Sequence, residues 1–112
     1  MDLCILIPAK NEQDSLAETV RLFQEVIPDD LSFNILVIND YSDDGTRELL
    51  ATLSREYENI NFADNELKGG VGNAIRYGLR IWSGDIVAIC MADGSDLPTD
   101  VVKLYYAILN EG

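Results

Sequence analysis

Two carboxylate side chains, Asp93 and Asp96, follow the last apolar run of this 112-residue chain. Carboxylates held about 4 Å apart repel each other by about 4 kcal/mol at an effective dielectric constant of about 20, so a cation between them is favoured. Mg²⁺ and Mn²⁺ prefer oxygen ligands and keep open positions for phosphate groups. The pair therefore indicates a metal site, or else Asp96 caps the helix that begins near Pro98.

A third carboxylate, Asp40, directly follows the apolar run that ends in Val37-Ile38-Asn39. A carboxylate at the end of a strand can accept hydrogen bonds from the N–H or hydroxyl groups of a ligand. It can equally form a turn, and the sequence leaves both interpretations open. Asp43, Asp44 and Thr46 fit turn and helix-capping roles better than a ligand-binding role.

A glycine-rich segment, KGGVGN at residues 68–73, leads into a helical pattern. Glycines allow backbone N–H groups to approach an anion, and the N-terminus of a helix favours negative charge. The segment is not a P-loop, because no Gly-Lys-Ser/Thr follows at the required spacing. It is not a dinucleotide fingerprint either, because Ile75 replaces the third glycine and the segment follows the third apolar run rather than the first. Both an anion-binding loop and a purely structural loop remain open.

The composition excludes several classes of function. The chain has 8 basic and 20 acidic residues and no histidine, which gives a net charge of −12. Nucleic-acid binding needs clustered lysine and arginine, and an anionic membrane surface would repel this chain. Catalytic triads and zinc sites that use histidine are absent. Cys4 and Cys90 lie in apolar runs and no signal peptide is recognisable, so a cytoplasmic, reducing location is the default expectation.

Alternating strands and helices must position these residues. Short apolar runs predict buried strands, and apolar residues at helical spacing predict amphipathic helices. The predicted strands are 3–7, 33–38, 59–63 and 85–91, and the predicted helices are 12–27, 46–57, 71–82 and 101–108. This alternation predicts a single α/β domain over residues 1–112, with an open, mostly parallel sheet and helices on both faces. A ligand is then expected beyond the carboxyl ends of the strands, where the winding direction reverses.

Four segments together resemble a known family. They are ILIPAKNEQDSL, ILVINDYSDDGT, GGVGNAIRYGL and GDIVAICMADGSDLP, and they cover nearly the whole chain. In this order they resemble family 2 glycosyltransferases with the GT-A fold, of the polyprenyl-phosphate or dolichol-phosphate mannosyltransferase-like kind. The resemblance implies a Rossmann-like nucleotide-binding half and transfer of a sugar, with inversion, from a UDP- or GDP-sugar donor. It further implies an acceptor such as a polyprenyl phosphate and a Mg²⁺ or Mn²⁺ ion on the diphosphate.

The resemblance also implies roles for individual residues. The nucleotide site would consist of Pro8, Ala9, Glu12, Ile38, Asp40, Lys68, Gly70 and Asp93, and the metal ligands would be Asp93 and Asp96. The chain departs from the family pattern where Lys10 replaces a common aromatic residue and where Asn39-Asp40 replaces an Asp-Asp pair. Ala92 stands at the usual first aspartate of the metal motif. No residue is identified as the catalytic base.

The resemblance implies a family domain longer than this chain. We therefore expect residues 1–112 to be a nucleotide-sugar-binding domain truncated before the acceptor-binding half, with little or no activity alone. The full-length protein is expected at the cytoplasmic membrane face. An alternative is a nonenzymatic nucleotide-binding or oligomerising module on the same fold, because an exposed sheet edge favours self-association. A receiver-like phosphoacceptor domain is disfavoured, because the first strand ends in Pro-Ala-Lys rather than an acidic pair.

Overall fold

The computed structural model describes residues 2–94 and 98–111 of the chain. Within these residues, strands and helices alternate as predicted. The strands are β1 (Leu3–Ala9), β2 (Phe33–Asn39), β3 (Ile60–Asp64) and β4 (Ile86–Ile89), and the helices are α1 (Leu16–Val26), α2 (Thr46–Glu56), α3 (Val71–Ile81) and α4 (Pro98–Glu111). The strands form one parallel sheet in the order β3-β2-β1-β4. The predicted α/β fold is confirmed.

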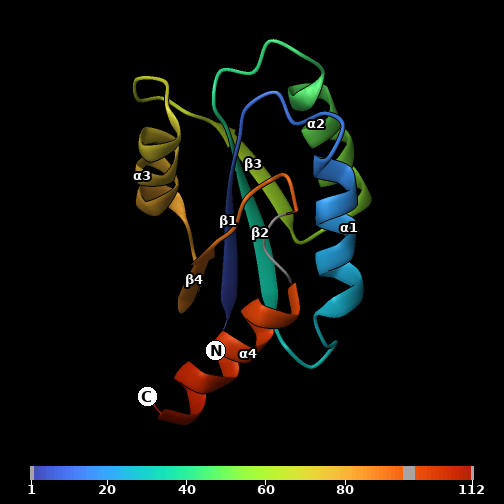
Figure 1. The fold of residues 1–112 in the computed structure, drawn as a ribbon, viewed down its shortest axis with the longest axis vertical. Helices are drawn as coiled ribbons and strands as arrows, with labels where there is room; N and C mark the ends of the chain where they lie inside the picture. Colours follow the sequence, from blue (N-terminus) through green and yellow to red (C-terminus); the bar gives the residue numbers. More distant parts are fainter. Residues whose placement is uncertain (1, 95–97, 112) are drawn as a thin grey trace.

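Helices cover both faces of the sheet, with α3 on one face and α1 and α2 on the other (Figure 1). The central strand β1 is buried along its whole length, which explains its unbroken apolar sequence. Its side chains alternate between the two faces: Leu3, Ile5 and Ile7 join the core under α1 and α2. Cys4 and Leu6 join the smaller core under α3.

Helix α4 packs less completely than the other helices. Val101 and Tyr105 of α4 reach the main core, whereas Leu104, Ile108 and Leu109 are exposed. The helix runs past the end of the sheet where the chain begins (Figure 1). Among the described residues, none of the helices has the length and apolar character needed to cross a bilayer.

The prediction that the first strand ends at Ile7 was wrong, because β1 continues through Pro8 to Ala9. In a parallel sheet, the backbone N–H and C=O groups of successive residues point alternately to the strand on one side and the strand on the other. The carbonyl of Leu6 accepts the Cys90 N–H at 3.0 Å, so even-numbered residues of β1 face the β4 side. Pairing with β4 ends where Leu6 lies opposite Ile89. The missing N–H of Pro8 therefore faces a position without a ladder partner, which is where a central strand tolerates proline.

Two other boundaries differ from the prediction in the same region. Helix α1 begins at Leu16 rather than Glu12, because residues 10–15 form a loop bonded to the loop after β2. Strand β4 is limited to Ile86–Ile89 instead of extending over 85–91. Since β4 is short and β1 is long, β1 projects beyond β4 at its carboxyl end.

Candidate functional site

A cavity of about 160 Å³ opens at the carboxyl edge of the sheet. Its lining comes from the end of β1, the loop that follows β1, the end of β2, the start of α3 and the segment after β4. The lining residues are Pro8, Ala9, Lys10, Glu12, Asp40, Val71 and Met91. The chain winds outward from β1 to β2 and β3 and then returns to place β4 on the other side of β1. The cavity thus lies at the reversal of winding, where ligands bind in open α/β sheets.

The structure brings together four residues that were predicted to bind the nucleotide: Pro8, Ala9, Glu12 and Asp40. Gly70 lies next to the cavity, because its chain neighbour Val71 is part of the lining. The other predicted residues lie elsewhere. Ile38 is fully buried in the core under α3, and Lys68 is exposed in the loop before that helix.

Hydrogen bonds between the two loops after β1 and β2 hold Glu12 at the cavity. The N–H of Glu12 donates to Thr46 Oγ1 at 2.9 Å. The N–H of Asn11 donates to Ser42 Oγ at 3.0 Å, and the Asn11 side-chain oxygen accepts the Asp43 N–H at 2.9 Å. Asn11 adopts a φ of 54°, a left-handed conformation that asparagine tolerates better than most residues. These polar residues therefore join the two loops to each other.

Asp44 and Thr46 form the turn expected from the sequence, but Gly45 rather than either of them is the N-cap residue of α2. Thr46 is fully buried, and Asp44 Oδ1 accepts both its N–H at 2.9 Å and its hydroxyl at 2.5 Å. The side-chain hydrogen bond from Thr46 lowers the pKa of Asp44 below its ordinary value. This carboxylate therefore belongs to the start of α2 rather than to the cavity.

Asp40 connects the end of β2 to the glycine-rich loop. Its side chain is only 4% exposed. Oδ1 accepts the Asn65 side-chain N–H at 3.0 Å, and the Gly70 N–H lies 3.1 Å from Oδ2 and 3.3 Å from Oδ1. Gly70 is the N-cap residue of α3 and has no side chain of its own, so Asp40 provides negative charge at that helix N-terminus. Asp40 thus lines the cavity and supports the glycine-rich loop, and its role in binding a ligand stays a prediction.

Tyr41 and Asn65, for which the sequence predicted no role, also hold this loop. The Tyr41 hydroxyl donates to the Leu67 carbonyl at 2.7 Å, and the residue has a φ of 56°, a strained value for a bulky side chain. Asn65 is buried between Asp40 and the loop backbone. The sequence did contain a signal for Asn65: like Asp40, it is a polar residue directly after a strand.

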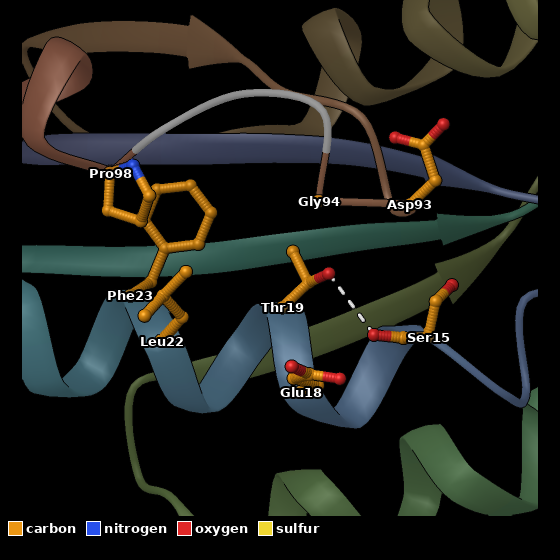
Figure 2. Close-up of a pocket in the computed structure, with 8 residues that line it drawn as sticks. All are labelled: Ser15, Glu18, Thr19, Leu22, Phe23, Asp93, Gly94 and Pro98. Carbon is orange, nitrogen blue, oxygen red and sulfur yellow. Dashed lines mark hydrogen bonds between the residues drawn. The ribbon is translucent and has the colours of Figure 1, made fainter.

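Asp93 lies in a second cavity, of about 180 Å³, between α1 and the segment that follows β4. Figure 2 shows the carboxylate of Asp93 directed away from Ser15, the N-cap residue of α1, and from Thr19 of that helix. Thr19 Oγ1 lies 3.0 Å from the Ala92 carbonyl and 3.1 Å from the Ser15 carbonyl, so α1 holds the base of this segment. The predicted metal ligand Asp96 lies outside the described residues.

Asp93 is the described residue predicted to hold the cation. Across residues 2–94 and 98–111, no group of three or more acidic, cysteine or histidine side chains is arranged to hold a metal ion. Asp93 is exposed, and its carboxylate oxygens are ligands that Mg²⁺ and Mn²⁺ prefer. These ions commonly take one or two carboxylates and complete their coordination with phosphate oxygens and water. The chemistry of Asp93 fits such an ion when a diphosphate is present.

Comparison with known families identifies the chain. Residues 4–112 match the family described as "Glycosyl transferase family 2". The chain belongs to glycosyl transferase family 2. The resemblance inferred from the four sequence segments is therefore confirmed, and a transferase is supported at the level of the family.

Curated relatives agree with this assignment. The chain is 32% identical over 99 residues to dolichyl-phosphate beta-glucosyltransferase ALG5A of Trichomonas vaginalis, a match covering 83% of this chain and 31% of the relative. It is 30% identical over 112 residues to undecaprenyl-phosphate mannosyltransferase of Micrococcus luteus, covering 96% of this chain and 44% of the relative. The chain thus spans less than half the length of either relative.

Solved structures share the fold. S. aureus TarS (residues 1–349) superposes with a TM-score of 0.77 at 22% identity, covering 99% of this chain and 33% of that one. Glucosyl-3-phosphoglycerate synthase from Mycobacterium tuberculosis, in complex with UDP, gives a TM-score of 0.78 at 20% identity, covering 98% and 40%. These likenesses confirm the GT-A fold of this glycosyl transferase family 2 chain.

Proposed function

We propose that this chain binds the nucleotide-sugar donor of a glycosyltransferase, with a Mg²⁺ or Mn²⁺ ion, and that the protein transfers the sugar to a lipid-phosphate acceptor. The single observation that supports this most strongly is the convergence of Pro8, Ala9, Glu12 and Asp40 on one cavity. These residues come from two separate segments of the sequence, residues 8–12 and residue 40. The cavity also lies at the reversal of winding, where an open α/β sheet binds its ligand.

The charge of the chain favours a cation in this proposal. The net charge is −12, and Glu12 and Asp40 line the same cavity. A donor diphosphate would meet a negative field, which a divalent ion would locally reverse. Asp93, which would hold that ion, lines the second cavity rather than this one. Lys10 in the lining and exposed Lys68 in the adjacent loop are the basic side chains available to support an anionic donor. When bound, the ion would neutralise charge on the leaving diphosphate.

In the proposed transfer, an acceptor oxygen forms a bond to the anomeric carbon of the sugar. The bond between that carbon and the donor phosphate oxygen breaks, and its electron pair leaves with the nucleoside diphosphate. The described residues of this chain would bind and orient the donor. The remainder of a longer protein would supply the acceptor site, since the relatives named above are more than twice as long as the matched part.

Similar proteins support these assignments. A mannosyltransferase from Pyrobaculum calidifontis was solved with GDP-Man and Mn²⁺; its TM-score to this chain is 0.71 at 23% identity, over 81% of this chain and 27% of that one. The Mycobacterium tuberculosis synthase was solved with UDP. The names of the two curated relatives specify dolichyl phosphate and undecaprenyl phosphate. The experiment therefore uses both a uracil nucleotide and a guanine nucleotide.

Calorimetric titration with UDP and GDP, each with and without Mn²⁺, tests the proposal. We expect Mn²⁺-dependent binding of one nucleotide by the wild-type chain and loss of that binding in the Asp93→Ala/Asp96→Ala double variant. The matched control is Asp29→Ala/Asp30→Ala, which removes the same charge from exposed residues before β2, at the opposite edge of the sheet. Failure of the folded wild-type chain to bind either nucleotide would contradict donor binding by this chain.

A second candidate function, self-association, is favoured by the edge strand β4. Within the described residues, β4 pairs with β1 alone, and Ile89 is 45% exposed. An unpaired edge with apolar side chains is a template for pairing with another chain. We expect Ile89→Lys to reduce the dimer fraction seen by light scattering, while the exposed Asn61→Lys on the other edge strand leaves it unchanged. A strictly monomeric wild-type chain would exclude this candidate.

A further inference from the structure

Asn65 is a buried side chain whose polar groups are all engaged. It stands directly after β3 and is only 4% exposed. Its backbone N–H donates to the Asn39 carbonyl at 2.9 Å, which attaches it to the end of β2. Its side-chain oxygen accepts the Leu67 N–H at 2.9 Å. Asn65 thus joins the sheet to the glycine-rich loop before α3.

The side-chain nitrogen of Asn65 makes the contact that matters for the cavity. Nδ2 lies 3.0 Å from Asp40 Oδ1 and 3.3 Å from the Lys68 carbonyl, so its two hydrogens serve two acceptors. The Gly70 N–H lies closest to the other carboxylate oxygen, Oδ2, at 3.1 Å. Two donors from different directions therefore fix the rotation of the Asp40 side chain.

We infer that Asn65 is a positioning residue for nucleotide binding, acting through Asp40 without lining the cavity itself. The inference rests on the proposed function, because Asp40 and Val71 line the proposed nucleotide cavity and Asn65 does not. Asn65 sets the orientation of the Asp40 carboxylate. It also sets the path of residues 67–70, which lead into Val71.

Only a side chain with an acceptor and two donors can make these three side-chain bonds. Aspartate has the same shape as asparagine but lacks the N–H donors at neutral pH. In Asn65→Asp, a second carboxylate would therefore stand about 3 Å from Asp40, where like charges repel. A proton shared by the two carboxylates would remove the repulsion and restore a donor. This substitution separates positioning from mere space-filling, because its effect depends on pH.

The test compares Asn65→Asp and Asn65→Ala with Asn61→Asp, a matched control on the exposed part of β3. Asn61→Asp changes the net charge equally but does not touch Asp40. Binding of UDP and GDP with Mn²⁺ is measured by calorimetry at several pH values from 7.5 down to 5. Thermal unfolding of each variant shows that it is folded at the titration temperature.

At pH 7.5 we expect Asn65→Asp and Asn65→Ala to bind at least about tenfold more weakly than wild type, as for loss of a hydrogen bond to a charged group. As the pH falls, Asn65→Asp should regain affinity relative to Asn61→Asp, whereas Asn65→Ala should not regain it relative to wild type. Other charged groups near Asp40 are Lys10 and Glu12 in the lining and Asp64, Glu66 and Lys68 in the chain around Asn65. They are common to all variants, as are the nucleotide phosphates, so their titration cancels in these ratios.

Equal affinities for Asn65→Asp and Asn61→Asp at every pH would overturn the inference. So would a loss in Asn65→Asp that does not recover in acid, since a merely structural defect behaves in that way. If wild type binds neither nucleotide, the proposed function fails. Amide hydrogen exchange of Gly70, measured without nucleotide, then still tests whether Asn65 orients the Asp40 side chain. Faster Gly70 exchange in Asn65→Ala, but not in Asn61→Asp, supports the role of Asn65 in holding Asp40; unchanged exchange contradicts it.

Discussion

The carboxylate of Asp40 accepts the backbone N–H of Gly70, with 3.1 Å between Oδ2 and the nitrogen, although the two residues are thirty positions apart. Asp40 directly follows β2, and Gly70 is the N-cap residue of α3. The bond therefore links a lining residue of the cavity to the start of α3, whose first residue Val71 also lines it. Gly70 has a φ of 130°, which is accessible to glycine and not to other residues without strain.

The first prediction concerns the charge of Asp40. In Asp40→Asn, the single remaining oxygen would have to accept from both Asn65 and Gly70, and the negative charge that strengthens both hydrogen bonds would be lost. We expect the free energy of unfolding to fall by about 1–3 kcal/mol. Urea unfolding measures the change, and Asp43→Asn in the exposed part of the next loop is the control of equal charge. Equal stabilities of the two variants would show that the Asp40 bonds contribute nothing.

The second prediction concerns two glycines of α3. A Cβ at Gly78 would overlap the buried Leu6 side chain and lie 3.1 Å from Ile38 Cγ1, whereas a Cβ at Gly72 meets no atom within 4 Å. Gly78→Ala should therefore cost about 1–3 kcal/mol through overpacking. Gly72→Ala should be neutral or should stabilise by up to about 1 kcal/mol, because alanine favours helix more than glycine does. Chemical denaturation of both variants tests this difference, and a stable Gly78→Ala protein would contradict the close packing of α3 on β1.

The third prediction concerns acid stability through Asp44. The hydrogen bond from Thr46 lowers the pKa of Asp44 in the folded state below 3.8, its ordinary value. A lowered folded-state pKa gives stability that is fully present above the unfolded-state value and is lost as the pH falls through the folded-state value. Asp44→Ala should thus be less stable than wild type at pH 7, and the difference should shrink below about pH 3.8.

Thermal unfolding over a range of pH measures that difference, with Asp43→Ala as the control for removing a neighbouring charge. A stability difference between wild type and Asp44→Ala that stays constant down to the lowest pH would mean that the carboxylate charge does not contribute. A difference of the same size in Asp43→Ala would mean that general charge repulsion, rather than the Thr46 bond, is responsible.

Much of the fold could be predicted from local sequence. The apolar run of β1 and the helical spacing of Leu16, Val20 and Phe23 each reflect burial that repeats with the period of one element. The end of β1 could not be predicted in the same way. Proline usually interrupts a central strand, and Pro8 is tolerated only because β4 stops before reaching it. That condition depends on the length of another strand, far away in the sequence.

The candidate site shows the same division. Pro8, Ala9, Glu12 and Asp40 were singled out by position after a strand or by family resemblance, and they do meet in one cavity. Ile38 was predicted with them, but its side chain is buried in the core under α3. Side chains two positions apart lie on the same face of a strand, so Ile38 and Asp40 share a face, and only Asp40 lies past the end of β2 where the cavity opens. Asn65 was missed because its role depends on bonds to β2 and to a loop, not on its own segment.

The order of strands and helices, the acidic charge and the family follow from the amino-acid sequence, because periodicity, composition and collinear motifs are properties of the chain. Three further features emerge only in the folded molecule: which strands are neighbours, how far β1 extends past β4, and which polar residues face one another across loops. Those outcomes depend on packing and hydrogen bonds between distant segments. The Asp40–Asn65–Gly70 contacts are of this second kind: each residue is an ordinary loop residue until three segments meet.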